Sequence, residues 1–83
     1  VVRANLDGSG AELFQSTTTG SGTYAGIAVD AVNRYVYWSN EGQSAIFRKA
    51  IGAALGAAPE TVANTASPPV SVAVDPADGN VYW

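Results

Sequence analysis

The chain contains no cysteine, no histidine and no methionine, and only 13% of its residues are charged. Without cysteine and histidine, disulfide bonds, thiolate or imidazole zinc sites and catalytic triads with an imidazole base are excluded. The absence of methionine indicates that an initiator or leader was removed, or that the sequence is an excerpt of a longer polypeptide.

The charge balance is slightly acidic, with four Lys and Arg residues against seven Asp and Glu residues and a net charge of −3. Nucleic-acid binding needs clustered positive charge to displace counterions from phosphates, so no nucleic-acid partner is expected. No apolar stretch approaches the roughly 18 residues that cross a bilayer, so no membrane partner is expected either. At 83 residues the chain forms at most one small domain.

The most informative feature present is an internal repeat with an offset of forty-five residues. Residues 26–38 read GIAVDAVNRYVYW, residues 71–83 read SVAVDPADGNVYW, and six of the thirteen aligned positions are identical. The identical pairs are Ala28/Ala73, Val29/Val74, Asp30/Asp75, Val36/Val81, Tyr37/Tyr82 and Trp38/Trp83. The offset also aligns Arg3 with Arg48 and Leu6 with Ile51, so it extends over the whole chain. Such a period is typical of repeats stacked against one another.

Each repeat is predicted to contain four short strands, because its apolar runs are rich in Val, Ile, Tyr and Trp and are bounded by turn residues. The strands are assigned to Tyr24–Asp30, Tyr35–Ser39, Ala45–Ile51, and Leu13–Ser16 or Thr61–Ala63. A tight turn at Asp30–Arg34 joins the first two, and its second copy carries Pro76 and Gly79. The alanine-rich stretch Ala50–Ala58 is interpreted as a strand end and a loop.

The main strands are apolar on both faces, as expected for a sheet between two neighbouring sheets in a propeller. We predict an all-β chain, a β-propeller of four-stranded antiparallel blades with two blade equivalents. With strands labelled A to D from the channel outward, their order along the chain is C-D-A-B-C-D-A-B. Within the single unit 1–83, residues 1–16 form an outer half-blade, residues 25–63 a complete blade and residues 70–83 an inner half-blade.

The two half-blades are not expected to meet within one chain, because the complete blade lies between them. Left alone they would expose apolar faces and unpaired strand edges, which favour association. We therefore expect a homo-oligomer in which each inner half pairs with the outer half of the next copy, closing into a ring where the rotation allows it. Two, three or four copies would give four, six or eight blades.

Three motifs resemble the YWTD β-propeller, the class B repeat of low-density-lipoprotein receptors. They are Gly26–Asp30 (GIAVD), Tyr37–Asn40 (YWSN) and Arg3–Ser9 (RANLDGS), in that family's order and spacing. Ser39 and Asn40 replace the family's usual Thr and Asp, and the second LDGS copy is reduced to Ile51–Ala54 (IGAA). The resemblance implies six blades, and hence a homotrimer, and it favours an extracellular or periplasmic location.

Two repeated residue types invite a functional interpretation. Asp30 and Asp75 end equivalent strands and could ring a channel around a metal, but an Asp that opens a tight turn usually accepts hydrogen bonds from nearby backbone amides. We prefer that structural interpretation. The repeated aromatic residues are interpreted as core between blades and not as a ligand surface. These residues are Tyr37, Trp38, Tyr82 and Trp83. Arg3 and Arg48 are expected to pair with carboxylates across strands, without a chemical role.

Loops at one end of such a scaffold are the expected place for a ligand. They are residues 17–24, residues 64–69 and residues 39–45. The candidate binding residues are Tyr24, Asn40, Glu41 and Gln43, and no catalytic residue, metal ligand or cofactor is assigned.

The leading hypothesis is a non-enzymatic binding or structural module whose loops face a protein or carbohydrate ligand. The alternative is a metal-dependent propeller enzyme, similar to lactonases or lyases, with a divalent cation in the channel. Such an enzyme needs several converging ligands, and only Asp30 and Asp75 are placed to supply them.

Overall fold

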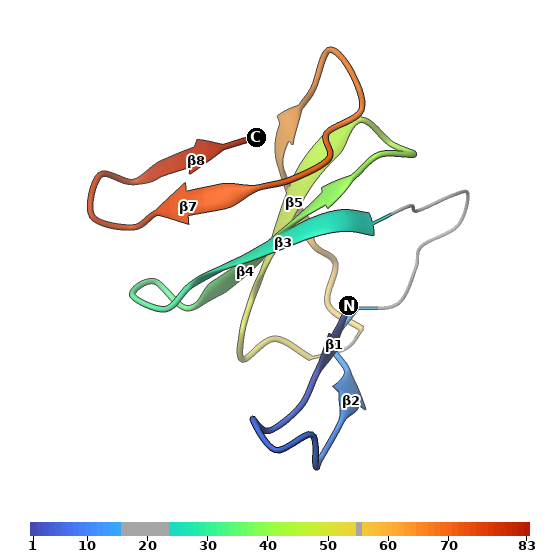
Figure 1. Ribbon diagram of the computed structural model, residues 1–83, viewed down its shortest axis with the longest axis vertical. Coiled ribbons are helices and arrows are strands. Elements are labelled where there is room, and N and C mark those ends of the chain that lie inside the picture. The colour runs from blue at the N-terminus through green and yellow to red at the C-terminus, as the bar shows by residue number, and fades with distance from the viewer. Residues whose placement is uncertain (16–23, 55) are drawn as a thin grey trace.

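The computed structural model describes residues 1–15, 24–54 and 56–83, and these residues form three antiparallel sheets and no helix (Figure 1). The central sheet contains β3 (Tyr24–Asp30), β4 (Tyr35–Asn40), β5 (Ala45–Ala50) and β6 (Glu60–Asn64). Two separate hairpins complete the described chain, β1 (Val2–Arg3) with β2 (Glu12–Leu13) and β7 (Ala73–Asp75) with β8 (Asn80–Tyr82), and of these only β7–β8 packs on the central sheet through β3. The prediction of an all-β, antiparallel chain is confirmed, and no sheet closes on itself within the described residues.

The strand order in the central sheet is the order along the chain, as expected for one four-stranded antiparallel unit. The predicted third strand ends one residue early, at Ala50, where the backbone N–H of Ala53 donates to the Ala50 carbonyl at 3.0 Å. The stretch after Ala50 is a loop up to β6, as predicted, apart from Leu55, which lies outside the described residues. The strand predicted at Leu13–Ser16 is Glu12–Leu13, and Ser16 lies outside the described residues.

The two faces of the central sheet are both apolar. Successive side chains in a strand point to opposite faces, and the pairing aligns Ala28, Tyr37 and Arg48 in one row and Ile27, Trp38 and Phe47 in the next. We name these faces the Tyr37 face and the Trp38 face after their central residues. Neither face can stay in water without exposing large hydrophobic side chains, so each requires a covering segment.

The β7–β8 hairpin covers the Tyr37 face, and Figure 1 shows it lying along β3. Tyr37, Ile46 and Val72 form the buried cluster, with exposed fractions of 6%, 0% and 9%. Partly buried apolar residues from both elements pack around it, namely Ala28, Tyr35, Ala63, Val74 and Val81. Burying a side chain of this size stabilises the fold by about 1.5–3 kcal/mol, so this interface is the main hydrophobic core.

Within the described ranges, the N-terminal segment covers the outer part of the Trp38 face and leaves its inner part open. The buried Lys49 side chain donates from Nζ to the Phe14 carbonyl at 2.9 Å and to Gln15 Oε1 at 3.1 Å. Its ammonium group also lies 5.0 Å from the centre of the Phe14 ring. Burial, followed by the nearby charge of Arg3, lowers the pKa of Lys49. This lysine fastens the segment before β3 to β5.

In a single copy the second copies of the repeated aromatic residues are exposed, as expected for a half-blade without its partner strands. Tyr37 and Trp38 are 6% and 2% exposed, whereas Tyr82 and Trp83 are 55% and 59% exposed. The first pair lies on β4, which has β3 and β5 as neighbours, whereas β8 pairs only with β7 in the described chain. Burial therefore follows the neighbours that a strand has, and not the motif alone.

Gly26 allows the close approach of the β7–β8 hairpin to β3. A Cβ atom added at Gly26 would lie 2.7 Å from the Cα atom of Ser71, which is backbone and cannot rotate away. The backbone N–H of Gly26 also donates to the buried Ser39 Oγ at 2.8 Å, which fixes β3 against β4. Ser71 is the residue equivalent to Gly26 in the second repeat, so the two copies touch at matching positions.

We expect Gly26→Ala to destabilise the chain by about 1–3 kcal/mol, because overpacking forces the backbone of β3 away from Ser71. Chemical denaturation followed by tryptophan fluorescence measures the change. Gly52→Ala is the matched control, since a Cβ atom added there meets nothing within 4 Å. Equal stability of the two variants would contradict the close packing of the hairpin on β3.

Candidate binding surface

Three of the four predicted binding residues meet at one end of the central sheet. Tyr24, Asn40 and Gln43 line a hollow of about 100 Å³, and Glu41 lies beside it in the turn between β4 and β5. The remaining lining residues are Gln15, Trp38, Phe47 and Pro59. The predicted loop of residues 17–24 lies outside the described residues except for Tyr24.

Asn40 builds the turn that presents Gln43. Its side chain is 1% exposed, its Oδ1 accepts from the backbone N–H of Gln43 at 3.1 Å, and its Nδ2 donates to Gln43 Oε1 at 3.1 Å. The turn is closed by the Ser44 N–H, which donates to the Glu41 carbonyl at 3.2 Å. Asn40 therefore positions Gln43, while Gln43 is exposed and Glu41 is partly exposed.

Aromatic rings form the wall of this hollow. Tyr24 meets Trp38 edge to face with 6.3 Å between ring centres, and Trp38 stacks on Phe47 at 6.2 Å. Sequence reasoning missed Phe47, although the pairing of equivalent strands would place it opposite Trp38 on the same face. It also missed Gln15 and Pro59, which reach the hollow through tertiary packing and carry no local signal.

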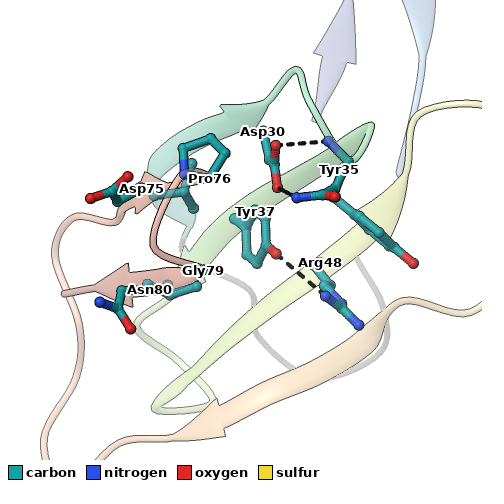
Figure 2. Close-up of a pocket in the computed structure, with 11 residues that line it drawn as sticks. Asp30, Tyr35, Tyr37, Arg48, Asp75, Pro76, Gly79 and Asn80 are labelled. Carbon is teal, nitrogen blue, oxygen red and sulfur yellow. Dashed lines mark hydrogen bonds between the residues drawn. The ribbon is translucent and has the colours of Figure 1, made fainter.

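A second hollow, of about 280 Å³, lies between the Tyr37 face and the β7–β8 hairpin (Figure 2). Arg48 supplies its cation: Nη1 donates to the Tyr37 hydroxyl at 3.4 Å, and Nε pairs with Glu60 Oε2 at 2.8 Å. The guanidinium group also lies 4.3 Å from the centre of the Tyr35 ring. These partners, the Tyr37 hydroxyl first and Glu60 second, raise the pKa of Arg48, so its charge is permanent.

Asp30 and Asp75 line this second hollow and open equivalent turns. Asp30 Oδ1 accepts from the backbone N–H groups of Val32 and Asn33 at 3.0 and 2.9 Å, and Asp75 Oδ1 accepts from those of Ala77 and Asp78 at 3.1 and 3.4 Å. The interpretation of the repeated Asp as a turn former is therefore confirmed.

The same turn geometry recurs at the residue that closes each turn. Arg34 has φ 65° and Gly79 has φ 73°, and their N–H groups donate to the carbonyls of Asp30 and Asp75 at 2.9 and 2.8 Å. This positive φ explains why the second copy carries glycine.

The described residues contain no group of three or more acidic side chains close enough to share a metal ion. Asp30 Oδ2 also accepts from Asn33 Nδ2 at 2.8 Å, so both oxygens of that carboxylate are engaged. In the same described ranges, no helix has the length and apolar character needed to cross a membrane.

In comparisons with known proteins, no family model and no curated protein matches the chain. The resemblance to YWTD propellers therefore rests on the motifs of the sequence.

We expect the contribution of Asp30 to stability to depend on pH. Hydrogen bonds from the Asn33 backbone and side chain hold the pKa of Asp30 below its ordinary value of 3.8. Because the folded-state pKa is depressed, the carboxylate stabilises the fold above pH 3.8 and loses this effect as the pH falls through the folded-state value.

Asp30→Asn should therefore have a lower thermal midpoint than the wild type at pH 7, and the two midpoints should converge as the pH is lowered below 4. Asp78→Asn, which removes an exposed carboxylate from the equivalent turn, is the control and should follow the wild-type curve. A midpoint difference for Asp30→Asn that stays constant with pH would contradict the argument.

Proposed function

We propose that the chain is a non-enzymatic binding and structural module, a unit of a YWTD-like β-propeller that three copies complete to six blades. One observation carries the proposal: a complete four-stranded antiparallel sheet has the β7–β8 hairpin packed on one face, and the N-terminal segment reaches part of the other face at Lys49. The hairpin before it matches the outer half of the sheet in sequence, and the hairpin after it matches the inner half. Stacked sheets of this kind are the building blocks of propellers.

Equivalent contacts in the two repeats support this proposal. Arg3 Nε pairs with Glu12 Oε1 at 2.7 Å across β1 and β2, and Arg48 Nε pairs with Glu60 Oε2 at 2.8 Å across β5 and β6. The β1–β2 and β5–β6 hairpins thus each carry an Arg–Glu pair across their strands, and the β3–β4 and β7–β8 hairpins each open their turn with an Asp.

The loop hollow favours a protein ligand over a carbohydrate. Ligand pockets for small molecules usually have volumes of about 300–1,000 Å³. The hollow around Tyr24 and Gln43, at about 100 Å³, has room for one side chain of a partner, with aromatic rings at its wall and amide groups at its rim. A peptide segment that inserts one side chain and bonds to Gln43 matches this size and chemistry.

Selection from a random peptide library tests this proposal. We expect selected peptides to bind the wild type and to lose at least tenfold in affinity, or about 1.4 kcal/mol, with Tyr24→Ala and Gln43→Ala. Val32→Ala is the control, because Val32 is 75% exposed in the turn at the opposite end of β3. Tighter binding of the wild-type chain to immobilised oligosaccharides than to any selected peptide would contradict the protein-ligand assignment. Selected peptides that bind both loop variants as tightly as the wild type would contradict it as well.

A metal-dependent enzyme remains the second candidate, because Asp30, Asn33, Asp75 and Asn80 all line the hollow in Figure 2. The hydrogen bonds of both Asp carboxylates within their turns argue against it. Calorimetric titration with calcium should therefore give no binding heat. Tight binding that is abolished by Asp30→Asn and Asp75→Asn, in chains that still fold, would overturn the non-enzymatic assignment.

A further inference from the structure

The inner part of the Trp38 face is left uncovered by the described chain. Ile27 and Val29 on β3 are 57% and 55% exposed, and Val2 on β1 is 64% exposed. Together with Val36 they line a hollow of about 250 Å³ between β3 and the N-terminal segment. This apolar strip, defined by Val2, Ile27 and Val29, lies on the face opposite the main hydrophobic core.

In the second repeat, the residues equivalent to this strip are covered by another sheet. Val72 and Val74 are the residues equivalent to Ile27 and Val29. Val72 is only 9% exposed because β7 packs on the Tyr37 face of the central sheet, with Val74 beside it. The same surface type is thus covered in one repeat and uncovered in the other.

A matching surface is exposed on β8 at the other end of the chain. Tyr82 and Trp83 are 55% and 59% exposed, whereas their equivalents Tyr37 and Trp38 are buried beside β5. The strand equivalent to β5 is β1, which pairs only with β2 in the described chain. Within the described residues, one copy therefore has a free edge on β8 and a free edge on β1, which correspond to the paired edges of β4 and β5 in the complete sheet.

We propose that β8 of one copy pairs antiparallel with β1 of a second copy, with Trp83 opposite Val2 and Tyr82 opposite Arg3. The register is taken from the complete sheet, where Trp38 pairs with Phe47 and Tyr37 pairs with Arg48. The forty-five-residue offset is added to the β4 residues to give those of β8 and subtracted from the β5 residues to give those of β1. This inference deepens the proposed function and rests on it: it specifies the junction by which copies complete the propeller.

The junction buries the strip on both sides. When β8 of one copy pairs with β1 of the second copy, the side of the incoming hairpin that carries Tyr82 lies on Ile27 and Val29 of the second copy. Within one chain, the Tyr37 face packs on Val72 and Val74 in the equivalent way. The contact between β7–β8 and the Tyr37 face within one chain is therefore the template for the contact between copies. We assign a second copy as the occupant because β8 and β1 are the equivalents of β4 and β5, which pair in the complete sheet.

The charged residue at the junction also has a partner. In the complete sheet Arg48 Nη1 donates to the Tyr37 hydroxyl at 3.4 Å while Nε pairs with Glu60. Arg3 already pairs through Nε with Glu12 and donates from Nη1 to the Ile51 carbonyl at 2.7 Å. A guanidinium group has five N–H donors, so Arg3 keeps a donor for the Tyr82 hydroxyl of the second copy.

Disulfide trapping tests the register directly, because the chain has no cysteine of its own. Directly opposed residues in antiparallel strands have Cα atoms about 4.5–5.5 Å apart, within the range that a disulfide spans. Chains carrying Val2→Cys are mixed with chains carrying Trp83→Cys under mild oxidation and separated on a non-reducing denaturing gel. Both positions are exposed in a single copy, so neither change disturbs its core.

We expect a linked pair of chains from Val2→Cys with Trp83→Cys, and loss of the link when Leu13→Cys replaces Val2→Cys. Leu13 is the matched control because it is 48% exposed and lies opposite Val2, one strand further from the junction. Arg3→Cys with Tyr82→Cys, in the same register, should also link. Failure of both register pairs, or equal linking through Leu13, overturns the proposed junction.

Light scattering on the wild-type chain separates failure of this junction from failure of the proposed assembly. A mass of three times 8.5 kDa supports three copies in a six-bladed ring. That mass without either disulfide would overturn the β8–β1 register and leave the proposed assembly standing. A mass of 8.5 kDa, or a disulfide formed within one chain carrying both Val2→Cys and Trp83→Cys, would overturn both.

Discussion

The structure depends on one constraint: the central sheet is apolar on both faces and must be covered on both. The Tyr37 face receives the β7–β8 hairpin, which buries Ile46 completely and Val72 almost completely. Among the residues that the structure describes, the Trp38 face receives only the N-terminal segment, held by the buried amine of Lys49. The difference in cover explains why Ile27 and Val29 on β3 stay 57% and 55% exposed, whereas Tyr37 and Ile46 on the opposite face are buried.

Sequence reasoning succeeded where short-range interactions decide the structure. The strand order and the tight turns follow from the apolar runs and from Asp30, whose carboxylate needs only the next few backbone amides as partners. The second repeat confirms that this turn depends on local hydrogen bonds, since Asp75 also accepts from backbone amides of its own turn although its hairpin lies in another sheet. A residue with such partners behaves alike wherever its segment is placed.

A motif alone does not give the exposure of its side chains, because exposure depends on the neighbouring strand or sheet. Tyr82 and Trp83 carry the same motif as Tyr37 and Trp38, yet their exposure is opposite because β8 lacks the second neighbour that β4 has. The loop hollow shows the same limit. Three predicted residues reach it, but the role of Asn40 in orienting Gln43 depends on side-chain geometry that spacing does not specify.

The internal repeat shows which contacts form within a single hairpin and which depend on a segment packed against it. Arg3 and Arg48 both pair with a Glu across the strands, and both lie over an aromatic ring, at 5.1 Å from Phe14 and 4.3 Å from Tyr35. Exposed pairs of this kind contribute only about 0–1 kcal/mol, so they specify pairing more than they stabilise it.

Burial of the aromatic and branched side chains contributes more, and it is incomplete in the half-repeats. The cross-strand pairs are therefore complete within each hairpin, whereas burial depends on what else packs on it: Val72 is buried on the Tyr37 face, while Tyr82 stays exposed.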